Sequence, residues 1–207
     1  MNETQDRNKP LVNVKELAAK MIWRLGGCTD LAVCMALLET FREFCDQSEV
    51  WRETRKLEIA DCGFDVEQHS VCQSQIPNPK SQIHHFCVPA GCRVKSVFTV
   101  RSCLGVFPSR AWRFLECHGG HGEIETRNLH KEDMRVDFSV VPNDDNENIP
   151  QWMVDRWGGV IRSGALYRLF AMDGKPWSDA TQARLEMEKW TAGLSEAAHE
   201  GIVRGSF

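Results

Sequence analysis

Helical hydrophobic spacing is found at both ends of this 207-residue chain, and the middle of the chain lacks it. A helix that buries one face repeats apolar residues every three or four positions, whereas a half-buried strand alternates them with polar residues. Residues up to about 60, and again from about 150, follow the first pattern, and the stretch between them follows the second. This order favours a helix bundle whose two halves are separated in sequence by a β region.

The N-terminal part predicts a helical hairpin. Apolar residues from Val14 to Leu25 fall on one stripe, and Gly26-Gly27 ends it. Thr29 and Asp30 can cap a second helix, in which apolar residues recur from Leu31 to Cys45. Two helices joined by so short a turn are expected to pack against each other.

A third helix is expected over SEVWRETRKLEI, from Ser48 to Ile59. Its support is electrostatic, because Glu49 precedes Arg52 and Glu53 precedes Lys56 at the three-residue spacing that brings opposite charges together on a helix.

The middle of the chain has the texture of short strands. Proline and glycine recur every several residues from position 61, and RVKSVFTVR alternates Val94, Phe98 and Val100 with polar residues. Ala111 to Leu115, GEIETRNL and MRVDFSVVP supply further strands, and the polar PNDDNENIP closes the region.

Helical spacing returns from Pro150 and continues to Leu169, and a final helix is expected near Ser178, capped by Ser178 or Asp179. The DGKPW sequence between these helices invites comparison with a phosphate-binding loop. That motif needs a glycine-rich turn after a strand and a lysine followed by Ser or Thr, whereas Lys175 precedes a proline. We therefore interpret the stretch as a helix corner, in which Gly174 is expected to take the left-handed conformation that ends the first of the two helices. Its packing residues are expected to be Gly164, Gly174, Pro176 and Trp177.

Together these patterns predict an α+β fold in which N- and C-terminal helices pack as one bundle with an inserted, mostly antiparallel β domain. The expected division places the first helices at residues 1–60 and the β domain at 61–148. The last helices and the tail occupy 149–207.

Composition narrows the function classes. A net charge of -4 with mixed charges argues against a dedicated nucleic-acid binder. No apolar run approaches the roughly 20 residues that span a bilayer, and the first ten residues are polar, so we expect synthesis and folding in the cytoplasm without membrane contact. The nine cysteines are accordingly expected to be mostly reduced.

Cysteine and histidine supply the only candidate chemistry. CHGGH at 117–121 has His130, Cys103 and the His84-His85-Phe86-Cys87 cluster as possible companions, but zinc sites usually show two short ligand pairs at regular spacing. A glycine hairpin turn is the favoured interpretation, with no metal and no cofactor. No nucleophile signature surrounds any cysteine, and Asp144-Asp145 lies in the polar linker, so we do not expect an enzyme.

The two helical ends share motifs with a known family. IPQWMVDRWGGVIRSGALYRLFAMDGKPWSDATQARLEMEKWTAGLSEA contains a proline-led helix with SGAL and RL, a GKPW turn, and a helix of the form A-x(6)-W-x(2)-G-x(3)-A. FREFCDQSEVWRETRKLEI contains FC, S and WR in that order. The chain thereby resembles the head-to-tail adaptor (connector) proteins of short-tailed bacteriophages, the tail tubular protein A type. The likeness covers about 95 residues, and the β part matches only in placement and length.

The resemblance implies a structural role in the virion. Family members form a ring of twelve copies, a dodecamer, between the portal protein and the tail nozzle, around a channel through which DNA passes without sequence-specific binding during ejection. The location implied is the head–tail junction of the virion. The C-terminal segment tends to reach toward the portal, which implies a portal-binding role for Ile202, Val203, Arg204 and Phe207, with a frayed terminus as the alternative.

Two other functions remain open at this point. One is a metal-dependent or thiol enzyme built around the Cys/His-rich β region. The other is a phage regulator that binds a host protein.

Overall fold

A computed structural model of the chain describes residues 10–59, 81–103, 105–118, 120–127 and 133–204. The fold is α+β, and the chain divides into two compact units. The helical unit combines Met1–Val50 with Pro142–Phe207, and the β unit comprises Trp51–Val141. The β unit is thus inserted in the sequence between the two parts of the helical unit.

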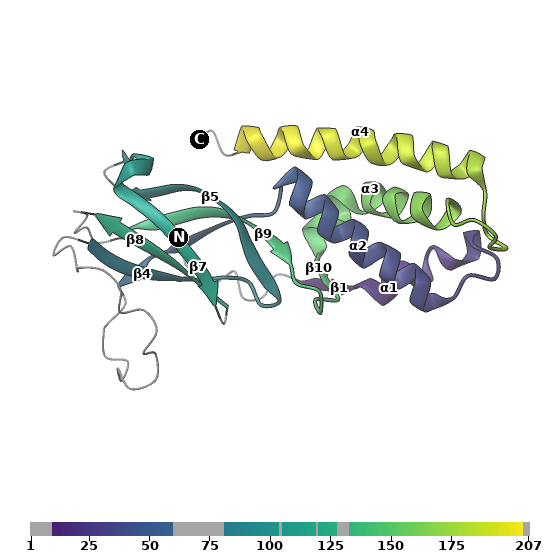
Figure 1. Ribbon diagram of the computed structural model, residues 1–207, viewed down its shortest axis with the longest axis horizontal. Helices are drawn as coiled ribbons and strands as arrows, with labels where there is room; N and C mark the ends of the chain where they lie inside the picture. The colour runs from purple at the N-terminus through teal and green to yellow at the C-terminus, as the bar shows by residue number, and fades with distance from the viewer. Residues whose placement is uncertain (1–9, 60–80, 104, 119, 128–132, 205–207) are drawn as a thin grey trace. The chain divides into compact units, whose positions relative to one another are not determined.

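Within the described residues, the helical unit runs from a short strand, β1, to its longest helix, α4 (Figure 1). Helix α2 packs against α1, α3 and α4, and α3 packs against α4. Strand β1 pairs antiparallel with β10, which joins the two parts of the unit just before α1 and α3 begin. The bounds are β1 Leu11–Asn13, α1 Val14–Ala19, the 3-10 turn η2 Ile22–Arg24, α2 Asp30–Ser48, β10 Asn148–Pro150, α3 Gln151–Phe170 and α4 Ala180–Arg204.

Aromatic side chains fill the core between the helices. Phe44 of α2 is fully buried, and its ring centroid lies 5.7 Å from that of Trp157 in α3 and 6.0 Å from that of Trp190 in α4. One aromatic residue therefore ties both C-terminal helices to the N-terminal hairpin, as large buried rings commonly do. The expected packing of both helical ends into one bundle follows from this contact.

The β unit contains two four-stranded antiparallel sheets among the described residues, in the orders β2-β9-β5-β6 and β3-β4-β8-β7. Phe86 of β4 and Phe138 of β9 face each other across the sheets with ring centroids 4.7 Å apart. The unit is therefore a small sandwich with an aromatic centre. The bounds are β2 Arg52–Lys56, β3 Glu58–Ile59, β4 Ser81–Cys87, β5 Cys92–Ser102, β6 Gly105–Val106, the 3-10 turn η3 Ser109–Ala111, β7 Trp112–His118, β8 His121–Arg127 and β9 Arg135–Pro142.

Most expected elements are confirmed. Thr29 caps α2 by accepting the backbone N–H of Ala32. RVKSVFTVR lies in β5, GEIETR in β8 and RVDFSVVP in β9. CHGGH spans the end of β7 and the start of β8, where Gly120 has a positive φ of 85°, as a tight hairpin turn favours.

The third expected helix is wrong. Glu49 has a φ of 49°, in the left-handed region, and ends α2 there. The charged residues that follow form β2, which pairs antiparallel with β9 from Arg52↔Ser139 to Lys56↔Arg135. Charged side chains suit this position because β2 is an edge strand of its sheet. The β unit consequently starts at Trp51 and ends at Val141, ahead of the expected 61 and 148.

The first helix is shorter than expected. Leu11–Asn13 forms β1, and the Asn13 side chain caps α1 by accepting the N–H of Lys15 at 2.9 Å. After Ala19 the chain continues through η2 before the Gly26-Gly27 turn.

Candidate functional site

The corner between α3 and α4 is held by side-chain caps. Asp179 accepts the backbone N–H groups of Thr181 at 2.9 Å and Gln182 at 3.0 Å, and so caps α4. Ser178 accepts the N–H of Lys175 at 3.2 Å and donates to the carbonyl of Met172. Of the two residues expected to cap the helix, Asp179 is the one that does so.

Gly174 has the expected left-handed conformation, with a φ of 70°, but it does not end α3. The helix ends at Phe170, with Ala171 as a right-handed cap that donates to the carbonyls of Tyr167 and Leu169. Gly174 instead reverses the chain three residues later. The expectation that Gly174 caps the helix is therefore wrong. Ala171 is the cap, and because its N–H is bonded within the helix in a right-handed conformation, no residue with a positive φ is needed there.

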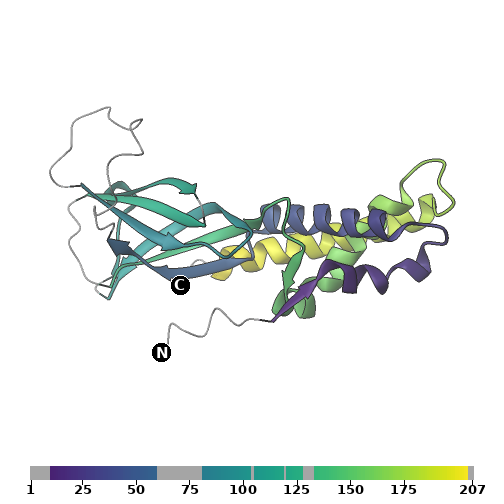
Figure 2. The same cartoon turned by 90° about the horizontal axis from the view of Figure 1, so that it is seen from below.

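The corner lies beside the first turn of the bundle. A Cβ atom built on Gly27 would lie 3.7 Å from Cβ of Pro176, which is ordinary van der Waals contact. Figures 1 and 2 both show these two turns at the same end of the helical unit. Trp177 is partly buried there, so Pro176 and Trp177 both belong to the packing of this end. We call it the turn end of the bundle.

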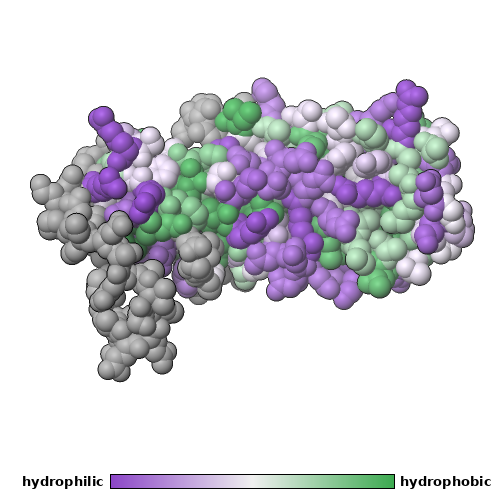
Figure 3. Space-filling view, in the orientation of Figure 1, coloured by the Kyte–Doolittle hydropathy of each residue, from purple (hydrophilic) through white to green (hydrophobic). Residues whose placement is uncertain are grey.

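Large apolar side chains are exposed around the turn end. The Trp23 side chain is 78% exposed just before the Gly26-Gly27 turn, and Met172 lies in the corner between α3 and α4. The others belong to the first two turns of α2 and α4. Figure 3 shows hydrophobic residues reaching the surface at this end, beside a strongly hydrophilic middle of the bundle. The exposed set is Trp23, Leu31, Met35, Met172, Leu185 and Met187.

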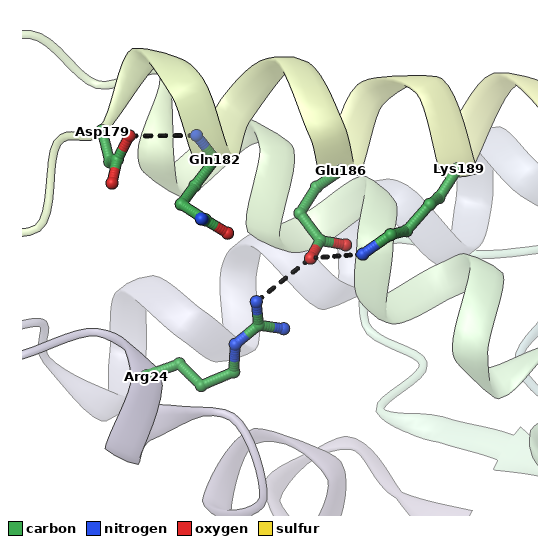
Figure 4. A network of polar contacts seen from close by, with 5 residues as sticks. All are labelled: Arg24, Asp179, Gln182, Glu186 and Lys189. Carbon is green, nitrogen blue, oxygen red and sulfur yellow. Dashed lines mark hydrogen bonds and ion pairs between the residues drawn. The ribbon is translucent and has the colours of Figure 1, made fainter.

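A buried carboxylate lies beneath this surface. Glu186 of α4 is 2% exposed and its Oε1 accepts from Arg24 of η2 at 3.1 Å and from Lys189 at 3.0 Å (Figure 4). Burial raises the pKa of Glu186, but hydrogen bonds from Ser163, Lys189 and Arg24 outweigh it and leave the pKa below its usual value. The carboxylate therefore stays charged, and its bond to Arg24 holds η2, just before the Gly26-Gly27 turn, against α4.

Gly164 of α3 lies where α2 and α4 approach it closely. A Cβ atom at this position would lie 2.5 Å from Cγ2 of Thr40 in α2 and 2.6 Å from Cε3 of Trp190 in α4. Only a residue without a side chain permits this approach of three helices.

The predicted portal-binding residues fall at the end of α4. Ile202 is 68% exposed in the last turn of the helix, and the backbone of Val203 and Arg204 continues that turn, whereas Phe207 lies outside the described residues. Gly201 precedes them and is buried. A Cβ atom on Gly201 would lie 2.4 Å from the backbone oxygen of Ser48, so this position has no room for a side chain. Residues 201–204 thus belong to α4.

The Cys/His candidates are scattered over the β unit. His84 is buried and contacts Thr126, His85 pairs with Glu123, and Cys103 is exposed, while His130 lies outside the described residues. Sγ of Cys87 lies 3.9 Å from Nδ1 of His121. Among the side chains that the structure describes, no group of three His, Cys, Asp or Glu is placed to hold a metal ion.

Thiol chemistry finds little support in the helical unit. Burial is the main cause that raises the pKa of both the Cys28 and Cys34 thiols, which keeps them protonated and weakly nucleophilic. Asp144, a carboxylate of the polar PNDDNENIP segment, forms an ion pair with Arg42, with 3.3 Å between its Oδ1 and Nη1 of the arginine.

No helix within the described ranges has the length and apolar character needed to cross a membrane. A scan against protein-family models finds no match to this chain, and a search of curated proteins finds no relative.

Proposed function

We propose that this chain is a structural virion protein, a ring-forming adaptor that joins the portal vertex to the tail at the head–tail junction. Its partners would be the portal protein, a tail nozzle protein and further copies of itself, with DNA passing through the ring without sequence-specific binding. The role is scaffolding by complementary surfaces. The observation that supports it best is the group of exposed apolar side chains at the turn end of the bundle.

Exposed apolar groups of this kind favour a protein partner. Single apolar residues are common on any surface, but a group such as Trp23, Leu31 and Met35 around one pair of turns is typical of an interaction site. A ring needs a contact in which one face of a subunit meets a different face of its neighbour. The turn end supplies one such face, and its rigid support by Glu186 and the corner caps favours a preformed contact.

The end of α4 supplies a second candidate contact, with the portal. Ile202 is exposed although it follows a tightly seated glycine, so the helix presents an apolar residue from a fixed position. The proposed portal segment comprises Ile202, Val203, Arg204 and Phe207.

Co-assembly with the portal ring tests this function. The full chain is mixed with the portal protein encoded beside it, and complexes are separated by sedimentation and viewed by electron microscopy. We expect rings of this protein on one face of the portal. Absence of any portal complex, or binding only to a host protein, would overturn the proposal.

Two sets of variants test the surfaces. The double substitution Leu31→Glu with Met35→Glu places charges on the turn end and should abolish ring formation, while Val106→Glu changes an equally exposed apolar residue of the β unit and should not. Truncation after Gly201 keeps the residue that packs on Ser48 and should remove portal binding without unfolding the bundle. Unchanged assembly of both the double variant and the truncated chain would count against these surfaces.

A further inference from the structure

Methionine is divided sharply between the core and one surface of this protein. The chain contains seven methionines, of which Met1 lies outside the described residues. Three others are at most 2% exposed, namely Met21, Met134 and Met153. The remaining three are 52%, 38% and 49% exposed, namely Met35 of α2, Met172 of the corner and Met187 of α4. Every exposed methionine that the structure describes therefore belongs to the turn end of the bundle.

The cysteines near the turn end compete poorly with these methionines for an oxidant. Thiols react with peroxides as thiolates, and burial is the main cause that raises the pKa of both Cys28 and Cys34. A thioether has no proton to lose, so its reaction depends on exposure and not on a pKa. The methionine sulfurs are therefore the groups of this surface that a peroxide oxidises first.

Oxidation changes the chemical character of such a surface. When hydrogen peroxide attacks the sulfur, the O–O bond breaks, an S=O bond forms and the second oxygen leaves as water. The sulfur loses the two electrons that the peroxide gains. The product, methionine sulfoxide, is polar where the thioether was apolar. Burying a polar group without a hydrogen-bond partner weakens a contact by roughly fivefold or more.

We propose that Met35, Met172 and Met187 make the turn end a redox-sensitive assembly surface, on which oxidation by a hydroperoxide blocks the contact between copies of this chain. A methionine sulfoxide reductase restores the surface, because two thiols are oxidised to a disulfide and the sulfoxide oxygen leaves as water. This redox control rests on the proposed function, since the turn end is where copies of the chain are proposed to meet.

The fold beneath the surface is expected to survive the oxidation. The Glu186 carboxylate bonds to Arg24, and Asp179 caps α4. Peroxide oxidises none of these groups, and the three methionines that fill the core are buried. The modification should therefore change what the turn end contacts without unfolding the bundle.

Peptide mass spectrometry of the full chain after treatment with hydrogen peroxide tests the selectivity. We expect one added oxygen on Met35, Met172 and Met187 and none on the three buried methionines, with an unchanged circular dichroism spectrum. In urea all six should react, because unfolding exposes them equally. Equal oxidation of exposed and buried methionines in the folded chain would overturn the proposal. This measurement does not depend on ring formation.

Assembly on portal rings tests the consequence. The triple variant Met35→Leu, Met172→Leu and Met187→Leu keeps apolar side chains of similar volume that peroxide does not oxidise. A thiol reductant follows the peroxide in every sample to reverse disulfide and sulfenic acid formation. We expect peroxide to reduce assembly of the unchanged chain by roughly fivefold or more and to leave the triple variant unaffected. Treatment with both reductases, one for each sulfoxide epimer, should restore the unchanged chain.

Two results would overturn the redox control alone. One is ring formation by a chain whose three exposed methionines are fully oxidised, at the level of the untreated chain. The other is an equal loss of assembly in the peroxide-treated triple variant, which would place the damage elsewhere. If the untreated chain forms no rings on the portal, the proposed function itself fails, and the redox control fails with it.

Discussion

Gly164 of α3 faces Trp190 of α4 so closely that a methyl group on the glycine would lie 2.6 Å from Cε3 of the indole. We expect Gly164→Ala to destabilise the helical unit by about 1–3 kcal/mol, because Thr40 crowds the same position and the helices would have to separate. Urea unfolding followed by circular dichroism measures the effect.

Gly159→Ala is the matched control in the same helix. Its Cβ would meet no atom within 4 Å, so the substitution should stabilise by about 0.5–1 kcal/mol through helix propensity alone. Equal effects of the two substitutions would contradict the close crossing at Gly164.

Glu186→Gln should destabilise the helical unit by about 1.5–3 kcal/mol at neutral pH, since Arg24 and Lys189 would lose a charged acceptor. The folded-state pKa of Glu186 is lowered from 4.5, so its contribution is present above pH 4.5 and is lost as the pH falls toward the folded-state pKa. The free energy of unfolding, measured with denaturant over this pH range, should therefore fall more for the unchanged chain than for Glu186→Gln. Glu188→Gln, on the exposed side of the same helix, should follow the unchanged chain.

His84 should make the β unit acid-sensitive. Burial, with a smaller effect of His85, lowers its pKa from 6.5, and among the described residues Nδ1 has no hydrogen-bond partner while Nε2 lies 3.0 Å from Thr126. The stabilisation by the neutral ring is present above pH 6.5 and is lost as the pH falls below it toward the folded-state pKa.

Hydrogen exchange of β4 and β8 peptides, corrected for intrinsic rates, measures this loss. Protection should decrease below pH 6.5 in the unchanged chain and in His199→Gln, whose imidazole is exposed on α4. His84→Gln should show a weaker dependence on pH. The same dependence in all three proteins would exclude His84 as the cause.

Asp179→Ala should cost about 0.5–2 kcal/mol, because α4 would lose the cap that accepts two of its first N–H groups. Asp179→Asn keeps an acceptor and should retain most of the stability. Asp173→Ala removes a carboxylate from the same corner without removing a cap, so a loss as large as that of Asp179→Ala would show that the capping bonds are not what stabilises α4.

Helical spacing predicted α2, α3 and α4 well because each buries a long stripe of apolar residues. The same reasoning failed at Arg52–Lys56, where charge pairs suited a helix and an edge strand equally. The pairing of this segment with β9, whose residues lie 79 to 87 positions away along the chain, decided between the two. Such partners cannot be found from local spacing.

The candidate site was only partly accessible to prediction. Gly174, Pro176 and Trp177 marked the corner, but its contact with Gly27 depends on how the two hairpins pack. Likewise, the position of Cys87 beside His121 follows from strand register, which the spacing of cysteines and histidines does not encode.

The chain enters and leaves the β unit on neighbouring strands. The N–H of Val140 donates to the carbonyl of Trp51 at 3.0 Å, and β2 and β9 continue the pairing from there. The first and last residues of the insertion are therefore no farther apart than the two ends of an ordinary hairpin loop. Recombination at one point of the helical unit can therefore insert, remove or replace the whole β unit. The sandwich can change in this way while the helices before and after it in the sequence stay the same.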